Sequence, residues 1–290
     1  MTPRSLDEHL SSTTSRGVID AIVRRTGVDG ERIAKILSTY AAEARYGYDL
    51  ISPLLRRNER ILEVGSGLCM LSSFLRLQAH NVTALEPCSP GFDLFSEIQV
   101  VLLEHADAHV PIYHIKAEDL CPKHHGAFDF IFSINVLEHI PDLRGAIRAM
   151  ASVLAPQGRM WHTCPNYAVP YEPHFGVPLL PFFPRATGLL LPKRITEGEL
   201  WRDLNFVTYF GLRRIARANN LIVTFSRKTM ASALNRLESD AEFASRQRGI
   251  ASTAHRVLKA TGLLPAIGAI PPALSTPMMV EMVKARLPGE

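Results

Sequence analysis

The sequence predicts an α/β protein built on a doubly wound, mostly parallel sheet. From residue 60 onward, short apolar runs alternate with amphipathic segments, a pattern typical of βαβ units. Several runs are apolar almost throughout, as expected of strands that are covered on both faces. The first run ends in Gly65-Ser66-Gly67 and a helical segment follows at once, which predicts a ligand site at the carboxyl end of that strand.

Composition narrows the class of protein. The chain has 290 residues, 47% of them hydrophobic and 21% charged, with a net charge of +4. Basic residues form no dense tract, so we expect no nucleic-acid partner. The polar N-terminus lacks the apolar stretch of a signal peptide, and the four cysteines form no CxxC pair. We therefore expect a cytoplasmic protein with free thiols and no structural zinc.

The order of helices and strands follows from the spacing of apolar residues and from the positions of glycine and proline. We expect an irregular start over residues 1–16 and a helical N-terminal extension over 1–58, followed by the main domain over 59–290. Helices are predicted at 18–25, 31–44, 50–55, 69–78, 92–106, 143–155, 209–219 and 231–260. Strands are predicted at 61–64, 82–87, 110–117, 128–135, 158–166, 221–225 and 277–286.

Two segments interrupt this regular pattern. Seven of the chain's 20 prolines lie at positions 165–192, so we interpret residues 167–205 as an inserted cover over a substrate site. Residues 231–275 form a helical insertion before the last strand. Its end, 262–275, is apolar but broken by prolines and too short to span a bilayer. We expect that segment to pack on the sheet, with peripheral membrane contact as the alternative.

The sharpest local feature is the turn after the first strand. Glycine at 65 and 67 permits a tight turn and a close approach of the backbone to a ligand, and N–H groups at a helix start attract an anionic group. Glu86 ends the second strand, 23 residues after Glu63, where an acid can accept hydrogen bonds from ribose hydroxyls. A dinucleotide fingerprint needs a third glycine, but Met70 stands there, which favours a different nucleoside ligand.

These motifs, taken in order, resemble those of the class I S-adenosylmethionine-dependent methyltransferases. ILEVGSG is similar to the first motif of that family. The similarity continues in LEP (85–87), KAEDL (116–120), FDFIFSINVLEHIPD (128–142) and LAPQGRMWHTCPN (154–166). The resemblance implies a Rossmann-like fold with a seven-stranded sheet whose last strand is antiparallel. It also implies a methyltransferase that uses S-adenosyl-L-methionine.

The resemblance further implies the residues that contact the cofactor. The 65–67 turn would pass beneath its methionine part, and Glu63 would orient that turn. Glu86 would hold the ribose, the pair 117–118 would lie beside the adenine, and Asn135 would face the amino-acid end. The complete set is Glu63, Gly65, Ser66, Gly67, Glu86, Pro87, Ala117, Glu118 and Asn135.

Two positions depart from the family pattern. Cys69 stands where the family often has glycine, and its side chain would narrow the loop. Lys116 stands where many members carry an acid beside the adenine, so that contact would pass to Glu118 or to the backbone.

Histidines are the candidates for the chemistry. Methyl transfer to a hydroxyl benefits from a general base, and histidine suits that role near neutral pH. His174 lies inside the predicted cover, and His139 follows the fourth predicted strand, while we interpret His162 as a structural residue within a strand. Some relatives bind a divalent cation through Glu-x-x-Glu-His, but here Asn135 replaces the first carboxylate, so we expect no metal.

The most direct interpretation is a methyltransferase acting on a small molecule, such as a hydroxyl of a sugar, glycolipid or secondary metabolite. Two alternatives remain open. One is a methyltransferase for RNA or protein, and the other is a nucleoside-binding protein that keeps the fold without activity. Fold alone does not choose among them.

Overall fold

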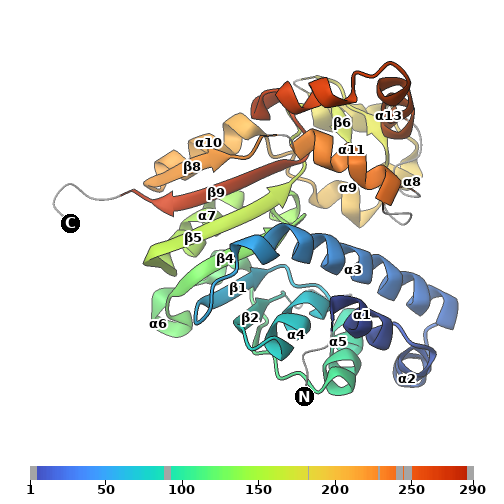
Figure 1. The fold of residues 1–290 in the computed structure, drawn as a ribbon, viewed down its shortest axis with the longest axis vertical. Helices are drawn as coiled ribbons and strands as arrows, with labels where there is room; N and C mark the ends of the chain where they lie inside the picture. Colours follow the sequence, from blue (N-terminus) through green and yellow to red (C-terminus); the bar gives the residue numbers. More distant parts are fainter. Residues whose placement is uncertain are drawn as a thin grey trace. The chain divides into compact units, whose positions relative to one another are not determined.

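The computed structural model describes residues 5–87, 93–181, 183–227, 229–239, 244 and 250–285. Contacts within the chain divide it into two compact units. The first consists of Met1–Ile134 and Ser152–Gly158, and the second of Asn135–Ala151 and Arg159–Glu290. Each unit is described by itself below (Figure 1).

The sheet confirms the predicted fold class. Seven strands follow the order β3-β2-β1-β4-β5-β9-β8. The strands are β1 (Arg60–Val64), β2 (Asn81–Leu85), β3 (Ile112–Tyr113), β4 (Phe128–Ile134), β5 (Leu154–Cys164), β8 (Leu221–Phe225) and β9 (Met278–Lys284). In the first unit β1 pairs in parallel with β2 and β4, and β2 with β3. In the second, β9 is antiparallel to both β5 and β8, as predicted.

In the first unit the longer helices pack on one another and lie beside the strands (Figure 1). These are α1 (Leu6–Thr13), α2 (Arg16–Thr26), α3 (Gly30–Ile51), α4 (Met70–Leu77), α5 (Asp93–Ala106) and α6 (Pro122–His125), with the 3-10 turns η1 (Ser52–Leu54) and η2 (Ala117–Asp119). The expectation of an irregular N-terminus was wrong. Ser5 and Glu8 form a capping box that starts α1. Buried His9 then contacts the hydroxyl of Ser73 on α4 at 3.0 Å, which explains why the segment is ordered.

The helix α3 is longer than predicted. It continues to Ile51, and the third helix that we expected over 50–55 is replaced by the end of α3 and the 3-10 turn η1. Gly47 lies within this helix, where glycine ordinarily lowers helix stability. A β carbon at Gly47 would lie 3.1 Å from Leu71 and 3.2 Å from Ile134. The glycine therefore allows α3 to pack closely on α4 and β4, and packing overrides the propensity of the residue.

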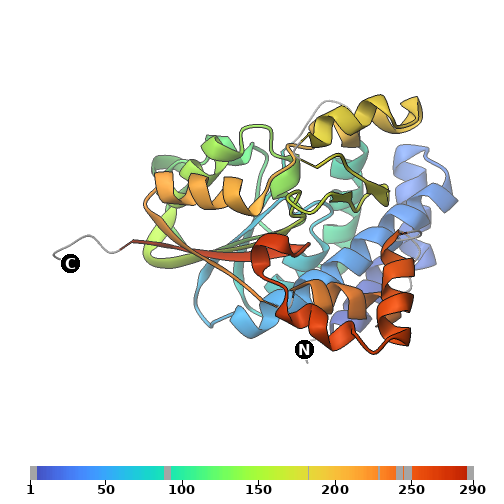
Figure 2. The same ribbon diagram turned by 90° about the horizontal axis from the view of Figure 1, so that it is seen from above.

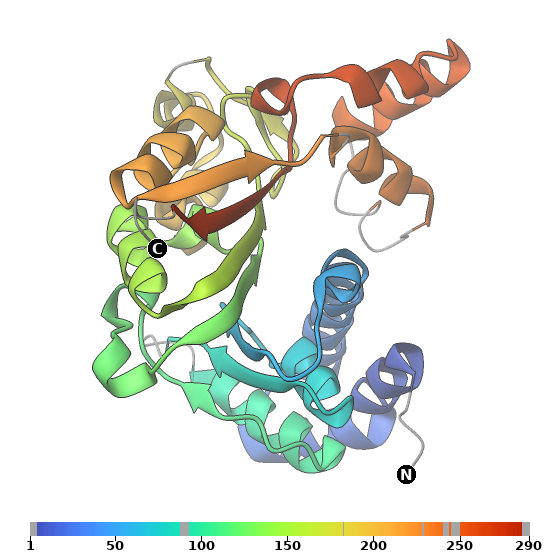
Figure 3. The same ribbon diagram turned by 60° about the vertical axis from the view of Figure 1, so that its left-hand side comes forward.

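The second unit contains β8, β9 and most of β5, together with the predicted cover. Its helical elements are α7 (Leu143–Ser152), α8 (Lys193–Thr196), α9 (Glu199–Asp203), α10 (Tyr209–Ala218), α11 (Thr229–Ser239) and α13 (Ile250–Ala260), and the 3-10 turns η3 (Leu137–His139), η4 (Pro184–Leu189), η5 (Leu264–Ala269) and η6 (Pro272–Leu274). Figure 3 shows β8 and β9 side by side with α10 next to them. The helix predicted over 231–260 corresponds to α11 and α13, and 240–243 and 245–249 lie outside the described residues.

The predicted cover has more regular structure than its sequence suggests. It begins with a hairpin of β6 (Tyr171–Glu172) and β7 (Val177–Pro178), then continues through η4, α8 and α9 (Figure 2, gold helices). Asn166 fixes the chain just before the cover. Its side-chain amide donates to the carbonyls of Ala273 and Ser275, and its carbonyl oxygen accepts from the N–H of Tyr209.

Two sequence expectations concern the environment of the chain. Among the residues that the structure describes, no helix is both long and apolar enough to cross a membrane. Cys69, Cys121 and Cys164 are free thiols, while Cys88 lies outside the described residues.

Candidate functional site

The turn between β1 and α4 has a backbone conformation that its glycines make possible. Gly65 and Gly67 have φ angles of 71° and 53°, values in the left-handed region that favours glycine. The N–H groups of Gly65 and Ser66 both donate to the carbonyl of Leu85 at the end of β2, at 2.8 and 3.2 Å. These N–H groups are therefore satisfied inside the protein, contrary to the expectation that they would attract an anion.

Gly67 is held by three elements of the first unit. Its N–H donates to the Glu86 carboxylate at 2.7 Å, and its carbonyl accepts a hydrogen bond from the buried amide of Gln99 on α5. On α3, the ring of Tyr40 covers the α carbon: a β carbon added to Gly67 would lie 2.4 Å from Cε1 of Tyr40. Phe95 contacts Tyr40 edge to face at 5.6 Å between ring centres. The second glycine is thus required by the packing of Tyr40.

Glu63 lies buried at the end of β1, directly before the turn. Burial raises the pKa of Glu63 to about 8, although a hydrogen bond from the hydroxyl of Ser72 on α4 partly opposes this rise. Burial likewise raises the pKa of Glu86, and its hydrogen bond from Gly67 opposes the rise. A cation bound at this turn would stabilise the ionised form of both carboxyls.

Cys69 follows the turn with φ of 57°, an unusual angle for a residue with a side chain. Its side chain is buried in a core cluster with Ala84 and Val110, and its sulfur lies 3.4 Å from the hydroxyl of Ser66. The thiol therefore fills space between α4 and β2, which gives a packing reason for this departure from the family pattern.

The predicted adenine contacts lie beyond β3, which is shorter than expected. Ala117 is buried, Glu118 is half-buried, and Lys116 is exposed. All three belong to the turn around η2, where Lys116 is the N-cap residue and Ala117 the first residue of the turn. Pro87, next to Glu86, is half-buried.

Asn135 begins the second unit and directly follows β4. It has φ of 53°, and its N–H donates to the carbonyl of Thr163 on β5 at 2.8 Å. Asparagine is one of the few residues besides glycine that adopts this conformation readily. The turn at Asn135 redirects the chain into η3, which carries Glu138 and His139.

The first unit fits a nucleoside without phosphate groups better than a dinucleotide. The three N–H groups of the 65–67 turn, which would meet a pyrophosphate, are all bonded to the protein itself. Glu86 at the end of β2 has the position and the chemistry to accept from ribose hydroxyls. The carboxyls of buried Glu63 and half-buried Glu86 lie beside the turn, and in their ionised form they favour a positively charged ligand and oppose an anionic one.

The cover brings a histidine and a buried carboxylate together. Glu172 on β6 is fully buried and accepts from Nδ1 of His174 at 2.5 Å and from the N–H of Phe175 at 2.7 Å. Tyr167 adds a hydrogen bond from its hydroxyl at 3.2 Å. Burial alone would raise the pKa of Glu172, but the hydrogen bonds from His174 and Phe175 outweigh it and lower the pKa below its ordinary value.

These hydrogen bonds fix the proton on His174. An ionised carboxylate can only accept, so Nδ1 of His174 donates its hydrogen to Glu172. In a neutral imidazole, the second nitrogen, Nε2, is then an acceptor. The hydrogen bond to Glu172 thus makes Nε2 the basic nitrogen of a neutral His174.

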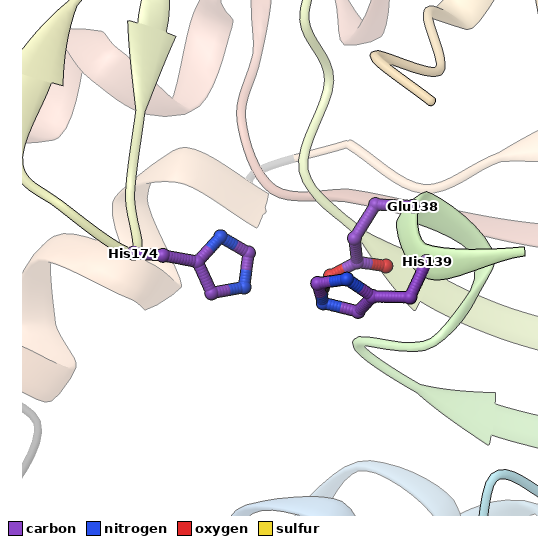
Figure 4. A group of neighbouring side chains, drawn as sticks. All are labelled: Glu138, His139 and His174. Carbon is purple, nitrogen blue, oxygen red and sulfur yellow. Dashed lines mark ion pairs between the residues drawn. The ribbon is translucent and has the colours of Figure 1, made fainter. Parts of the chain in front are cut away.

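His139 lies beside His174, with 5.1 Å between ring centres. Figure 4 shows the His174 ring pointing towards the His139 ring and the Glu138 carboxylate. Burial, and then the nearby charge of His174, lower the pKa of His139 to about 4. His139 is therefore neutral at physiological pH, and it is a weaker proton acceptor than an ordinary histidine.

The residue Asn205 at the end of the cover positions this cluster. Its amide donates to the carbonyls of Leu137 and Ile140 at 2.6 and 2.8 Å, and its own N–H donates to the carbonyl of Glu138 at 2.8 Å. Both ends of the cover thus contribute to one place in the second unit. His174 comes from the hairpin, while Asn205 fixes the turn that carries Glu138 and His139.

The same cluster could hold a metal ion. One ligand atom each from Glu138, His139 and His174 lies within 4.8 Å of the others. Our expectation of no metal rested on one carboxylate and one imidazole, whereas the structure adds a second imidazole from a distant segment. Two histidines and a carboxylate suit a transition metal better than magnesium.

Several residues of the site escaped the sequence analysis. Tyr40, Gln99 and Ser72 lie on helices and carry no local motif, so only the fold reveals that they contact the turn or the carboxyl before it. Glu172 was visible only as a neighbour of His174. His162 lies in β5, fully buried, and burial lowers its pKa to about 3.

Comparison with known proteins places this geometry in context. Residues 36–236 match a family model described as a methyltransferase domain. The uncharacterised protein Rv1509 of Mycobacterium tuberculosis (strain H37Rv) is 36% identical over 219 residues, covering 71% of this chain and 73% of that protein.

More distant matches extend the comparison. A ubiquinone biosynthesis O-methyltransferase of Xanthomonas euvesicatoria is 34% identical over 105 residues, covering 35% of this chain and 41% of that protein. Among solved structures, the [4+2]-cyclase SpnF aligns with a TM-score of 0.50 and 18% identity, covering 84% of this chain and 81% of that chain. At this identity the structural match supports the fold alone.

Proposed function

The chain belongs to the class I S-adenosylmethionine-dependent methyltransferases, and from this premise we propose that it methylates a hydroxyl group of a small molecule. The acceptor would be a sugar, a glycolipid or a secondary metabolite. The observation that carries this proposal is the hydrogen bond between His174 and buried Glu172, because it fixes a proton acceptor of the kind that a hydroxyl requires.

The first unit would hold the cofactor. Glu86 would accept from its ribose hydroxyls, Ala117 and Glu118 would lie beside its adenine, and the 65–67 turn would pass beneath its methionine part. When bound, S-adenosylmethionine supplies a methyl group that is already activated by the positive sulfur. The protein therefore has to position the acceptor and remove one proton.

The second unit would remove that proton. We assign the general base to Nε2 of His174, which would accept the hydrogen of the acceptor hydroxyl. The resulting imidazolium would be stabilised by the Glu172 carboxylate, as in other carboxylate–histidine pairs. His139, held neutral by burial, would orient the acceptor by a hydrogen bond and would not compete for the proton.

The cover favours a small acceptor. We propose that residues 167–205 enclose the substrate, because the hairpin that carries His174 and the segment that ends in Asn205 meet at one cluster. The stretch similar to an O-methyltransferase supports oxygen as the methylated atom. Residues 1–58 would remain the helical extension, and Tyr40 within it would cover the cofactor turn.

Turnover assays test this assignment. Release of S-adenosylhomocysteine would be measured with a panel of catechols, monosaccharides and glycolipids as acceptors. For an acceptor that reacts, His174→Gln should lower kcat by about 10²–10⁴-fold, the usual contribution of a general base. The matched control is His124→Gln, because His124 is exposed on α6 of the first unit, and it should leave kcat unchanged.

Other outcomes would contradict the proposal. If the His174→Gln variant turned over the acceptor as fast as the unmodified protein, His174 would not be the general base, and positioning of the acceptor would be the whole mechanism. Cofactor binding without turnover of any acceptor, RNA and protein included, would favour the nucleoside-binding alternative.

A metal-assisted mechanism is the second candidate, since the ligand atoms of Glu138, His139 and His174 lie close together. A cation there would occupy Nε2 of His174, and it would lower the pKa of the acceptor hydroxyl directly. Metal analysis of the purified protein separates the two mechanisms. Turnover that persists after treatment with EDTA favours the base, whereas loss of turnover that zinc, iron or manganese restores favours the cation.

A further inference from the structure

The cover carries an unusual concentration of exposed apolar side chains. Phe183, Leu189 and Leu190 are 71%, 89% and 73% exposed. Two further leucines of the same segment are also exposed, and together these residues form the cover patch: Leu180, Phe183, Leu189, Leu190 and Leu200. Single exposed hydrophobic residues need no explanation, but several within one short segment indicate an interaction surface.

The protein holds these side chains in place from beneath. Thr187 of η4 is buried, and it accepts a hydrogen bond from the N–H of Leu180 at 2.8 Å. The carbonyl of Thr187 also accepts from the N–H of Leu190 at 2.9 Å. Gly188 packs against the indole of Trp201, because a β carbon there would lie 3.3 Å from Nε1. The exposed leucines are therefore presented by an ordered turn.

Basic residues lie close in the sequence to the residues of the cover patch. Arg185, Lys193 and Arg194 are all exposed. Residues 180–200, which span the cover patch, contain three basic residues (Arg185, Lys193 and Arg194) and two acidic ones (Glu197 and Glu199), so the segment has a net charge of +1. Leu189 and Leu190 lie within five positions of Lys193 and Arg194. Apolar side chains beside basic ones are the combination that binds the interface of an anionic membrane.

We propose that the cover patch docks on the surface of an anionic lipid membrane. Phe183, Leu189 and Leu190 would enter the boundary between headgroups and acyl chains, while Lys193 and Arg194 would contact lipid phosphates. The sequence analysis expected 262–275 to pack on the sheet and gave peripheral membrane contact of that segment as the alternative, so the present assignment moves the membrane contact to another part of the chain. In that segment Leu263 and Leu274 are exposed as well, by 55% and 60%, but Ile267 and Ile270 are half-buried and the segment contains no basic residue.

A membrane fits the patch better than a protein partner does. A protein interface usually centres on a pocket or a flat apolar core with a polar rim. The most exposed members of the cover patch, Phe183, Leu189 and Leu190, instead lie in η4 or directly beside it, and insertion into lipid needs no complementary surface. The proposal is independent of which group is methylated, so binding to lipid can be tested without knowledge of the acceptor.

Vesicle co-sedimentation tests the proposal with the full chain. The probes are vesicles of phosphatidylcholine with 30% phosphatidylglycerol, and vesicles of phosphatidylcholine alone. We expect binding to the anionic vesicles that weakens as salt is raised, because salt screens the lipid charge. The double variant Leu189→Ser/Leu190→Ser should reduce partitioning at least tenfold, and Lys193→Glu/Arg194→Glu should abolish the preference for anionic lipid.

The control is Phe210→Ser, which removes an apolar side chain of α10 that is also exposed but lies outside the cover patch. It should bind vesicles as the unmodified protein does. The proposal is overturned if the unmodified protein binds neither vesicle, or if Leu263→Ser abolishes binding while the double leucine variant keeps it. It is also overturned if the double leucine variant changes the oligomeric state in sedimentation velocity without changing vesicle binding.

Discussion

The two units of the chain carry different kinds of site. In the first unit, the turn at residues 65–67 is fixed from several sides, with Gly67 bonded to Glu86 and Gln99 and covered by Tyr40. In the second unit, the cluster around His174 depends on a hairpin, on the hydrogen bonds that Glu172 accepts and on those that Asn205 donates. The proposed cofactor site thus lies on strands and helices of the first unit, whereas the proposed general base lies on the cover.

The largest expected effect separates catalysis from cofactor binding. Glu172→Gln should lower kcat by about 100-fold or more, because an amide no longer fixes the tautomer of His174 or stabilises its charged form. Affinity for S-adenosylhomocysteine, measured by calorimetry, should stay unchanged. Tyr167→Phe is the control, because it removes only a neighbouring hydroxyl from Glu172. Comparable losses of kcat in both variants would argue against the dyad.

The next prediction concerns cofactor affinity, which the Glu172→Gln variant should leave unchanged. Gly67→Ala introduces a β carbon 2.4 Å from Tyr40 at a residue with φ of 53°. Left-handed backbone with a side chain costs roughly 1–2 kcal/mol, and the clash adds to it, so cofactor affinity should fall at least about tenfold. The double variant Gly67→Ala/Tyr40→Ala should recover part of this loss, because it removes the clash and keeps the strain. No recovery would show that Tyr40 does not determine the conformation of the turn.

A smaller effect concerns Tyr40 alone. Tyr40→Ala should weaken binding of S-adenosylhomocysteine about three- to tenfold, since the turn loses the ring that covers Gly67 and contacts Phe95. Tyr40→Phe keeps the ring and should bind nearly as well as the unmodified protein. If the phenylalanine variant loses as much affinity as the alanine variant, the hydroxyl near Glu86 matters more than the ring.

The smallest effect is a dependence on pH. The pKa of Glu63 is raised to about 8, so its carboxyl is neutral below pH 8 and negative above it. S-adenosylmethionine carries a positive sulfur that S-adenosylhomocysteine lacks. The ratio of their affinities should therefore rise by about two- to threefold between pH 7 and pH 9 in favour of the cation. Calorimetry at each pH measures the ratio, and Glu63→Gln should make it constant.

The sequence predicted the sheet and the tight turn at residues 65–67 because both depend on short-range patterns. Apolar runs identify β1, β2 and β4, and the spacing of Gly65, Gly67 and Glu86 is visible in one stretch of chain. The helix α1 was not predicted, because it depends on the capping box at Ser5 and on the contact of His9 with Ser73.

The second site was predictable only in part. His174 and His139 were candidates as residue types that can accept a proton, but nothing local shows that they face each other. The role of Glu172 depends on the turn of the hairpin, and that of Asn205 on a hydrogen bond across 68 positions. Tyr40 likewise contacts a turn more than 20 positions away. Such contacts are set by tertiary packing, which a single sequence does not display.

Calorimetric titration with S-adenosylmethionine and S-adenosylhomocysteine tests the central claim most directly. The unmodified protein should bind both in the micromolar range, and Glu86→Ala should weaken both by at least about tenfold, since the ribose hydroxyls lose an acceptor and the Gly67 N–H loses its partner. Glu118→Ala should have a smaller effect. Unchanged affinity in the Glu86→Ala variant, or no binding by the unmodified protein, would contradict the assignment of the first unit as the cofactor site.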